Sequence, residues 1–433
     1  MPPASRALHS LLRSPQSRSL FNRTFARNWT SLTRSKEALT VHALDDTSFP
    51  YIWLRDACQS TECVHESNRQ KLFRTSDIPL SIAPVEDEGG VRVTPEGIDI
   101  TWTDGHRSSF DRAFLERHSS QRKLAQWYFD DQLAEQGWTN ESIKQTRDLF
   151  IPYERVRDTE EGLVDAITQL AKYGLVFMTG VPNRETRTES GRCELGALAR
   201  RFGEIRETFY GVLWDVVNLK DSRNIAYTNL DLGLHMDLLY FQHPPRYQIL
   251  HCLRNQVVGG TSIFVDALHA ASVLRSTHPS DFDVLTKTPV SFHYDNDGHH
   301  LHREHYTIEL NKPTSTDPNE KPTISHINYS PPFQAPLPLS TPKEFYPALT
   351  RFAELLNDEK NTFQYTLREG DAVMFDNRRV LHARTAFADK EKAEVAVGEP
   401  NRWLKGCYVE ADALMDRVRV LKAKLEREAG KRR

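Results

Sequence analysis

The sequence contains little cysteine, with five residues at uneven spacings in a chain of 433. They are too few for a framework of disulfides, which favours a reducing compartment or a metal site. Long apolar runs are also absent, and because no stretch of about 18 apolar residues occurs, no membrane-spanning helix is expected. Proline and glycine follow no repeat, which excludes collagen-like and low-complexity chains. The remaining composition is that of a globular protein large enough for two or three domains.

Acidic residues are missing from the N-terminus. No Asp or Glu precedes Glu37, whereas seven Lys and Arg fall within residues 1–36, which leaves 49 basic against 59 acidic residues in the rest of the chain. An Arg- and Ser-rich, acid-free start is typical of a cleaved mitochondrial transit peptide, and a retained basic tail is the alternative. We therefore expect a mitochondrial location, with the cytoplasm as second choice. The acidic remainder has no basic stripe, which argues against nucleic acid as the main partner.

Short apolar runs separated by turn-rich segments make up most of the chain. Many short strands with few strand-helix-strand alternations favour a mainly β sandwich or jelly roll with flanking helices over a doubly wound sheet. Helical periodicity predicts helices at 160–173, 193–202, 267–275, 345–356 and 413–425. Predicted strands in the first part of the chain are 51–54, 91–93 and 98–102, and later ones are 175–178, 247–253, 262–265, 290–294, 306–310, 323–329, 362–367, 372–375 and 403–409. We divide the chain into an address at 1–36, a small β domain at 37–120, a connector at 121–155, a main domain at 156–425 and a basic tail at 426–433.

Two metal-capable side chains, His235 and Asp237, lie one residue apart and would project from the same face of a strand. Such a pair is common by chance, and a surface or hydrogen-bonded core histidine is the alternative. The pattern gains weight from His382, which follows a buried strand, and from Arg402 in a further strand-like run. Two histidines and one carboxylate can hold Fe(II) and leave three positions open, which suits a bidentate 2-oxo acid and O2. An arginine beside the metal can bind the far carboxylate of 2-oxoglutarate as a bidentate pair.

With these residues in place, the sequence resembles the Fe(II)- and 2-oxoglutarate-dependent oxygenases of the taurine-dioxygenase superfamily, in the branch of γ-butyrobetaine dioxygenase and trimethyllysine dioxygenase. The resemblance implies a double-stranded β-helix, iron at His235, Asp237 and His382, and 2-oxoglutarate at Arg402 with Leu250 lining the site. It also implies ascorbate as reductant and a possible homodimer. The segments that carry it are 53–56, 207–211, 226–228, 235–237, 248–252, 259–260, 375–377, 381–382 and 406–408.

The same resemblance bears on the substrate. Tyr210, Trp214, Tyr227 and Tyr408 match four aromatic residues that, in γ-butyrobetaine dioxygenase, form a cage for a trimethylammonium group. A quaternary cation donates no hydrogen bond and is best held over several aromatic faces. Ordinary core packing is the alternative for any one of them.

At the other end of the substrate the match is incomplete. Asn224 matches a contact to the substrate carboxylate, whereas Leu238 and Ser330 stand where γ-butyrobetaine dioxygenase has a tyrosine and an asparagine. The resemblance implies hydroxylation of γ-butyrobetaine to L-carnitine with release of succinate and CO2. Trimethyllysine hydroxylation, or another small substrate, is the alternative. Two alternatives belong to other functional classes. A non-catalytic metal-binding scaffold would not explain why all three iron ligands are intact, and a zinc hydrolase would not explain Arg402.

A second metal-like pattern lies in the predicted β domain. Cys58, Cys63 and His106 resemble the family's small zinc module, which uses three cysteines and one histidine. Ser60 replaces the middle cysteine. Zinc with three protein ligands and a water, completion of the site by His65, and a metal-free module held by packing all remain open.

Overall fold

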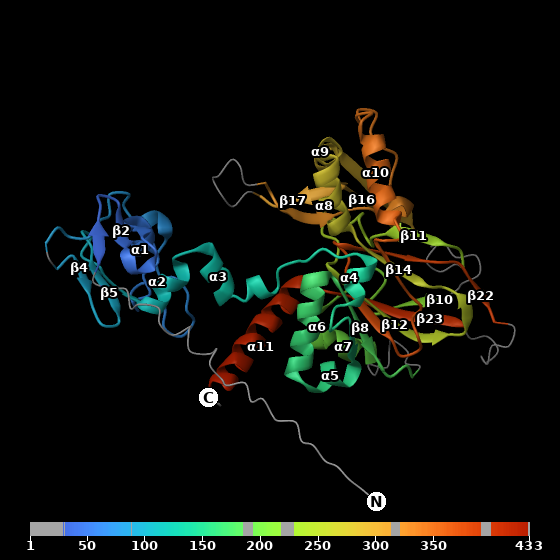
Figure 1. Ribbon diagram of the computed structural model, residues 1–433, viewed down its shortest axis with the longest axis horizontal. Helices are drawn as coiled ribbons and strands as arrows, with labels where there is room; N and C mark the ends of the chain where they lie inside the picture. The colour runs from blue at the N-terminus through green and yellow to red at the C-terminus, as the bar shows by residue number, and fades with distance from the viewer. Residues whose placement is uncertain are drawn as a thin grey trace, which may run out of the picture. The chain divides into compact units, whose positions relative to one another are not determined.

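The computed structural model describes Trp29 and residues 31–87, 89–184, 194–217, 229–312, 321–390 and 400–431. The chain forms two compact units, one ending at Tyr128 and the other beginning at Phe129 (Figure 1). Within the described ranges, no helix is both long and apolar enough to cross a membrane.

The first unit consists of two small antiparallel sheets and short helices around one apolar core. Trp102 is fully buried there, and its indole N–H donates to Ser108 Oγ at 2.8 Å. The predicted strands at 91–93 and 98–102 are confirmed to within one residue. The elements are β1 (Leu32–Arg34), β2 (Ala38–Val41), β3 (Thr47–Pro50), β4 (Val91–Val93), β5 (Gly97–Thr101), β6 (Arg107–Asp111), α1 (Tyr51–Asp56), α2 (Arg112–His118) and α3 (Gln121–Trp127).

The prediction of a strand at 51–54 is wrong, because this segment forms the helix α1. Tyr51 and Leu54 are buried, and their spacing of three puts them on one helical face toward the core. Pro50, just before the first turn, lacks an N–H and so loses no helical hydrogen bond there. A four-residue apolar run fits the period of a helix as well as that of a strand, so tertiary packing decides.

The second unit contains a seven-stranded sheet in the order β10-β23-β12-β20-β8-β7, with β9 beside β23. Neighbouring strands are antiparallel except β7 and β8, which are parallel. The strands are β7 (Phe150–Pro152), β8 (Leu175–Thr179), β9 (Ile205–Arg206), β10 (Trp214–Val217), β12 (Tyr247–Asn255), β20 (Ala372–Asp376) and β23 (Arg402–Val409).

A smaller sheet, in the order β11-β21-β14-β19, packs on the inner face of the large one. Aromatic side chains of both sheets, such as Phe177, Phe264 and Phe375, meet in the core between them. This is a double-stranded β-helix, so the predicted jelly-roll class is confirmed. The strands of the smaller sheet are β11 (Leu232–His235), β14 (Ser262–Asp266), β19 (Thr362–Tyr365) and β21 (Val380–Arg384), and a separate pair is formed by β13 (Val257–Gly259) and β22 (Phe387–Asp389).

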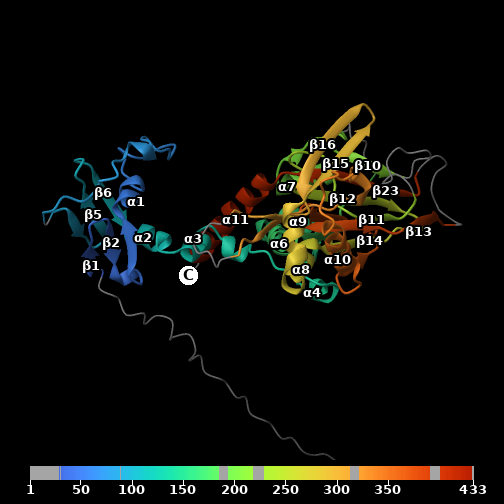
Figure 2. The same cartoon turned by 90° about the horizontal axis from the view of Figure 1, so that it is seen from above.

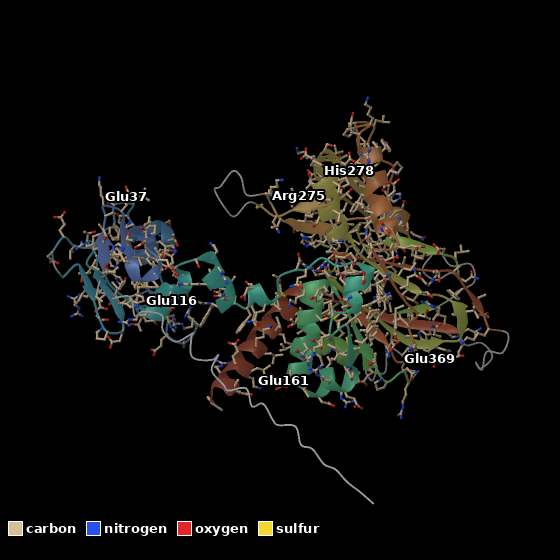
Figure 3. All side chains as sticks on the ribbon, viewed as in Figure 1. Glu37, Glu116, Glu161, Arg275, His278 and Glu369 are labelled. Atoms are coloured by element: carbon tan, nitrogen blue, oxygen red, sulfur yellow. The ribbon has the colours of Figure 1, made fainter. Side chains whose placement is uncertain are left out.

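Helices cover the outer face of the large sheet (Figure 1). The predicted helix at 160–173 is confirmed as α6 (Glu160–Tyr173). The Thr159 side chain accepts from the Gly162 N–H, Glu161, labelled in Figure 3, lies in the first turn, and Gly174 ends the helix in a left-handed conformation. The other helices on this face are α5 (Tyr153–Asp158), α7 (Glu194–Phe202) and α11 (Ala411–Lys431).

An insertion between β14 and β19 forms a second layer of helices and hairpins, and its apolar core continues into residues of β10, β11, β21 and β23. Its long hairpin, β15 with β16, is seen in Figure 2. The predicted helices at 267–275 and 345–356 are confirmed, whereas α9 and β16 were not predicted. The elements are α8 (Ala267–Thr277), α9 (Pro279–Lys287), β15 (Pro289–Asn296), β16 (His299–Tyr306), β17 (Ile308–Leu310), β18 (Ile324–Ile327) and α10 (Phe345–Asn357).

The segment 121–155, which we expect to be a connector, contains short elements of both units. Its first part is α3, and its later part holds α4 (Asn140–Lys144), β7 and the start of α5. β7 is only three residues long and joins the edge of the large sheet beside β8. Such short pieces span too few residues to show a hydrophobic period in the sequence.

Candidate metal and co-substrate site

The structure brings together the three side chains that we expect, from the sequence, to be metal ligands. His235 ends β11, Asp237 follows two residues later, and His382 lies opposite His235 on β21. His235 Nε2 and His382 Nε2 lie 3.4 and 4.0 Å from the same oxygen, Asp237 Oδ1. One ligand atom from each residue lies within 4.8 Å of the other two. Two imidazoles and one carboxylate on one side of a metal position form the facial arrangement that suits non-haem iron.

Neighbouring groups orient these side chains. His235 Nδ1 lies 2.8 Å from the Gly233 carbonyl oxygen and donates to it, which leaves the Nε2 lone pair toward Asp237. The Tyr408 hydroxyl donates to Asp237 Oδ2 at 3.0 Å. The side-chain amide of Asn377 accepts from the Asp237 backbone N–H at 2.8 Å and donates to its carbonyl oxygen at 3.0 Å. The aspartate is therefore held from both its backbone and its carboxylate.

The surroundings favour the protonation states that a metal requires. Burial opposes the charge of Asp237, but the adjacent imidazoles of His235 and His382 and the hydrogen bond from Tyr408 hold the pKa of this carboxyl far below its usual range. Burial lowers the pKa of His382 to about 3, and neighbouring His235 adds to the effect. At neutral pH the site therefore offers an ionised carboxylate and a neutral imidazole, which are the metal-binding forms.

A cavity of about 80 Å³ adjoins the three ligands. Arg402, at the start of β23, lines it and is 5% exposed. Burial and the charge of Arg384 lower the pKa of Arg402 to about 10, so it remains a cation at neutral pH. Within the described part of the chain no carboxylate pairs with Arg402, and its Nε atom has no hydrogen-bond partner. Besides the three candidate metal ligands and Arg402, the residues that line the cavity are Trp214, Val216, Leu232, Gln248, Leu250, Ser262, Phe264, Ala383, Arg384 and Leu404.

Two of the four aromatic residues singled out in the sequence lie next to the three candidate metal ligands. Trp214 on β10 and Tyr408 on β23 have ring centroids 5.3 Å apart. The six-membered ring of Trp214 packs against Gly406 on β23, where a Cβ atom would come within 2.2 Å of Trp214 Cη2. Tyr210 belongs to a neighbouring aromatic cluster, with its ring centroid 4.3 Å from that of Phe209. The fourth aromatic, Tyr227, and Asn224 lie outside the described residues.

The two departures from the expected carboxylate-binding residues are both buried. Leu238 directly follows Asp237 and has a φ angle of 62°. A leucine in this left-handed region is strained, and such strain is often found at functional sites. Ser330 is 1% exposed, and its hydroxyl has no hydrogen-bond partner among the described residues.

The cysteine cluster also forms. Cys58 Sγ and Cys63 Sγ each lie 3.3 Å from His106 Nε2, and Cys58 Sγ lies 3.4 Å from Ser60 Oγ. Burial raises the pKa of the Cys58 thiol, but hydrogen bonds with Ser108, Ser60 and His106 outweigh burial and lower it to about 7. His65 is exposed and bonds to Ser67, so the described cluster of possible ligands contains three residues.

Sequence reasoning missed three polar residues of the cavity, namely Gln248, Ser262 and Arg384. Two of them could be found from strand alternation. Arg384 follows His382 by two residues on β21, and Gln248 precedes Leu250 by two on β12, so each shares a face with a residue already singled out. Ser262 lies opposite Arg384 on β14, which the sequence does not reveal.

A double-stranded β-helix with two histidines, an aspartate and a buried arginine around one cavity defines the class of 2-oxoglutarate-dependent dioxygenases. The profile of the family "Taurine catabolism dioxygenase TauD, TfdA family" matches residues 141–408, and that of "Gamma-butyrobetaine hydroxylase-like, N-terminal" matches residues 30–116. The chain therefore belongs to the TauD/TfdA family.

Curated relatives match over most of their length. The chain is 55% identical to "Dioxygenase str8" of Strobilurus tenacellus over 87% of this chain and 86% of that protein. It is 32% identical to "Gamma-butyrobetaine dioxygenase" of Pseudomonas sp. (strain AK-1), over 86% and 90%. It is 28% identical to human "Trimethyllysine dioxygenase, mitochondrial", over 86% and 82%. Among solved structures, a taurine dioxygenase from Burkholderia xenovorans is 15% identical with a TM-score of 0.43, over 61% of this chain and 88% of that one.

Proposed function

We propose that this dioxygenase hydroxylates a small trimethylammonium amino acid, and specifically that it converts γ-butyrobetaine to L-carnitine. The observation that carries the proposal is Tyr408, whose hydroxyl bonds to Asp237 while its ring faces Trp214. One side chain thus connects a metal ligand with an aromatic surface. A cation held on that surface would keep its carbon chain at a fixed distance from the metal.

In this proposal His235, Asp237 and His382 hold Fe(II), and Arg402 with Leu250 receives 2-oxoglutarate. The donor set fits, because imidazole nitrogens and a carboxylate suit iron, and a buried arginine that pairs with no carboxylate among the described residues suits the carboxylate of a ligand. When bound, iron and 2-oxoglutarate supply the insertion of one oxygen atom of O2 into a C–H bond, coupled to oxidation of 2-oxoglutarate to succinate and CO2, with ascorbate as reductant. The task of the protein is to bind and orient the reactants.

Each group of residues has a distinct part in that task. Asn377 and Tyr408 fix the aspartate, and His235 is fixed by the Gly233 carbonyl group. The apolar lining, such as Leu250 and Phe264, excludes water from the cavity. The faces of Trp214 and Tyr408, with Tyr210, Tyr227 and Asn224 completing the substrate site, receive the trimethylammonium substrate.

A second candidate is a different small substrate, with trimethyllysine as the first to test. Leu238 and Ser330 favour it, because neither supplies the tyrosine or asparagine expected at the carboxylate end.

A substrate panel separates these candidates. Purified protein with Fe(II), ascorbate, O2 and 2-oxoglutarate should release succinate faster with γ-butyrobetaine than with trimethyllysine. As a matched control, 5,5-dimethylhexanoate has the same shape but a neutral carbon in place of nitrogen, and should be a much poorer substrate because the cation–π attraction is lost. Equal or reversed turnover of the two amino acids would contradict the substrate assignment. Equal turnover of the neutral analogue would contradict the aromatic cage.

We propose further that Cys58, Cys63 and His106 bind zinc, more weakly than a full site would. The fit is partial, because structural zinc sites nearly always have four protein ligands. Ser60→Cys would restore the fourth ligand and should raise zinc affinity in a competition with a chelator. Metal analysis of protein purified in zinc-supplemented buffer, showing below about a tenth of an equivalent of bound zinc, would contradict occupancy.

The composition of the N-terminus supports mitochondrial import. Trp29 packs against the core of the first unit, and β1 begins at Leu32 and pairs with β2. We therefore propose cleavage before β1, upstream of the predicted end at residue 36. Fusion of residues 1–36 to a fluorescent protein should direct it to mitochondria, and a diffuse cytoplasmic signal would contradict the proposal. Light scattering of the purified protein would test the homodimer.

A further inference from the structure

A second arginine, Arg384, lines the cavity that holds Arg402. Arg384 lies on β21, on the same face of the strand as His382, and opposite Ser262 on β14. The guanidinium groups of Arg384 and Arg402 lie 5.0 and 5.3 Å from the centroid of one ring, that of Phe387. Two cations on different sheets therefore share one aromatic side chain at one end of the cavity.

Burial makes this pair of like charges costly on its own. Arg384 and Arg402 are 6% and 5% exposed, and their mutual repulsion contributes to the lowered pKa of Arg402. Arg384 Nη2 donates to the Leu230 carbonyl oxygen at 2.6 Å, and Asp231 partly offsets its charge. Arg402 has no such carboxylate among the described residues. Buried cations are stable when an anion compensates them, so the end of the cavity beside Phe387 is suited to an anionic group.

Resting on the proposed function, we propose that Arg384 acts with Arg402 in binding the far carboxylate of 2-oxoglutarate, with Phe387 as the platform that keeps both guanidinium groups in place. Arg402 supplies a charge that no carboxylate of the described residues compensates, and Arg384 approaches the same carboxylate from the strand that carries His382. A consequence is that the cavity selects strongly for 2-oxo acids with a second carboxylate. An uncharged tail would leave the buried charge of Arg402 without an anion from the described residues.

The test compares two ligands that differ only at this end. 2-Oxopentanoate has the same chain length and the same 2-oxo acid group as 2-oxoglutarate but no far carboxylate. Dissociation constants for both are measured by calorimetry without O2 and without substrate, on the full-length protein loaded with Fe(II). For Arg384→Met we expect the dissociation constant of 2-oxoglutarate to rise about 30-fold, as for loss of a hydrogen bond to a charged group. The dissociation constant of 2-oxopentanoate should change less than about threefold, because this ligand has no far carboxylate.

Controls distinguish this role from a structural one. Arg384→Lys keeps the charge but loses the planar fork and should give an intermediate loss, which also serves if the methionine variant does not fold. Arg368→Met, at an exposed position of the same unit, should leave both constants unchanged. Equal weakening of both ligands, or unchanged 2-oxoglutarate binding, would overturn the proposal and assign Arg384 only to holding Leu230. If the unmodified protein fails to prefer 2-oxoglutarate over 2-oxopentanoate, the proposed function itself fails.

Discussion

Replacement of Tyr408 by phenylalanine should weaken metal binding and spare substrate binding. The Tyr408 hydroxyl is the group that donates to Asp237 Oδ2, at 3.0 Å, and burial keeps its pKa well above the ordinary value, so it stays a donor. A hydrogen bond to a charged group contributes about 2 kcal/mol. At about 1.4 kcal/mol for each factor of ten, its loss corresponds to a dissociation constant for Fe(II) raised about 30-fold. The phenylalanine ring still packs against Trp214, so the KM for the trimethylammonium substrate should change less than about threefold.

The assay is anaerobic titration of metal-free protein with Fe(II) in competition with a coloured chelator. Tyr247→Phe is the matched control, because Tyr247 is a buried tyrosine of the same large sheet whose ring belongs to the core on the outer face. Its removal should leave metal affinity unchanged. A Tyr408→Phe variant that binds Fe(II) as tightly as the unmodified protein would refute the orienting role of the hydroxyl. Loss of substrate binding with intact metal binding would reverse the two roles that we assign to this residue.

Three further predictions concern the cage and stability. Trp214→Ala should raise the KM for the cationic substrate and leave 2-oxoglutarate binding largely intact; a weakened dissociation constant for 2-oxoglutarate would contradict the cage. Burial lowers the pKa of His251 to about 4, so the unfolded state gains a proton first and the free energy of unfolding should fall as pH drops from about 6.5 to 4. In urea titrations at several pH values, His251→Asn should weaken the pH dependence of the free energy of unfolding. An unchanged pH dependence would show that His251 is not its cause. Arg379 Nη2 lies 2.9 Å from Asp266 Oδ2, so Arg379→Met leaves the buried Asp266 carboxylate without this ion pair and should lower the free energy of unfolding by about 3–5 kcal/mol. A loss below about 1 kcal/mol in urea titrations would contradict this role of the ion pair.

Features with local signals were predicted most accurately. Helix α6 has an N-capping threonine, apolar residues at helical spacing and a terminating glycine within sixteen residues, and its predicted bounds agree with the structure. The juxtaposition of His235 and Asp237 likewise follows from their spacing on a strand, and His382 follows a buried strand in the sequence. The geometry that joins these ligands, however, depends on the pairing of β11 with β21, about 145 residues apart in the chain.

Features without such local signals were missed. The run at 51–54 became a helix because Tyr51 and Leu54 pack into the core of the first unit. The hairpin strand β16 is rich in histidine and mostly exposed, so it lacks the apolar alternation by which strands are recognised. The approach of Trp214 to Gly406, and of Arg384 and Arg402 to one phenylalanine ring, depends on strand register that no short motif specifies. Long-range packing therefore determined the parts that the sequence did not predict.

In the proposed reaction, oxidation of 2-oxoglutarate at iron held by His235, Asp237 and His382 is coupled to hydroxylation of a substrate held against Trp214 and Tyr408. The most direct measurement is the yield of succinate and of hydroxylated product from γ-butyrobetaine, in the unmodified protein and in His235→Ala. We predict equimolar succinate and L-carnitine from the unmodified protein and neither from the variant. Succinate release that is independent of γ-butyrobetaine, or coupled turnover that persists in His235→Ala, would contradict the account.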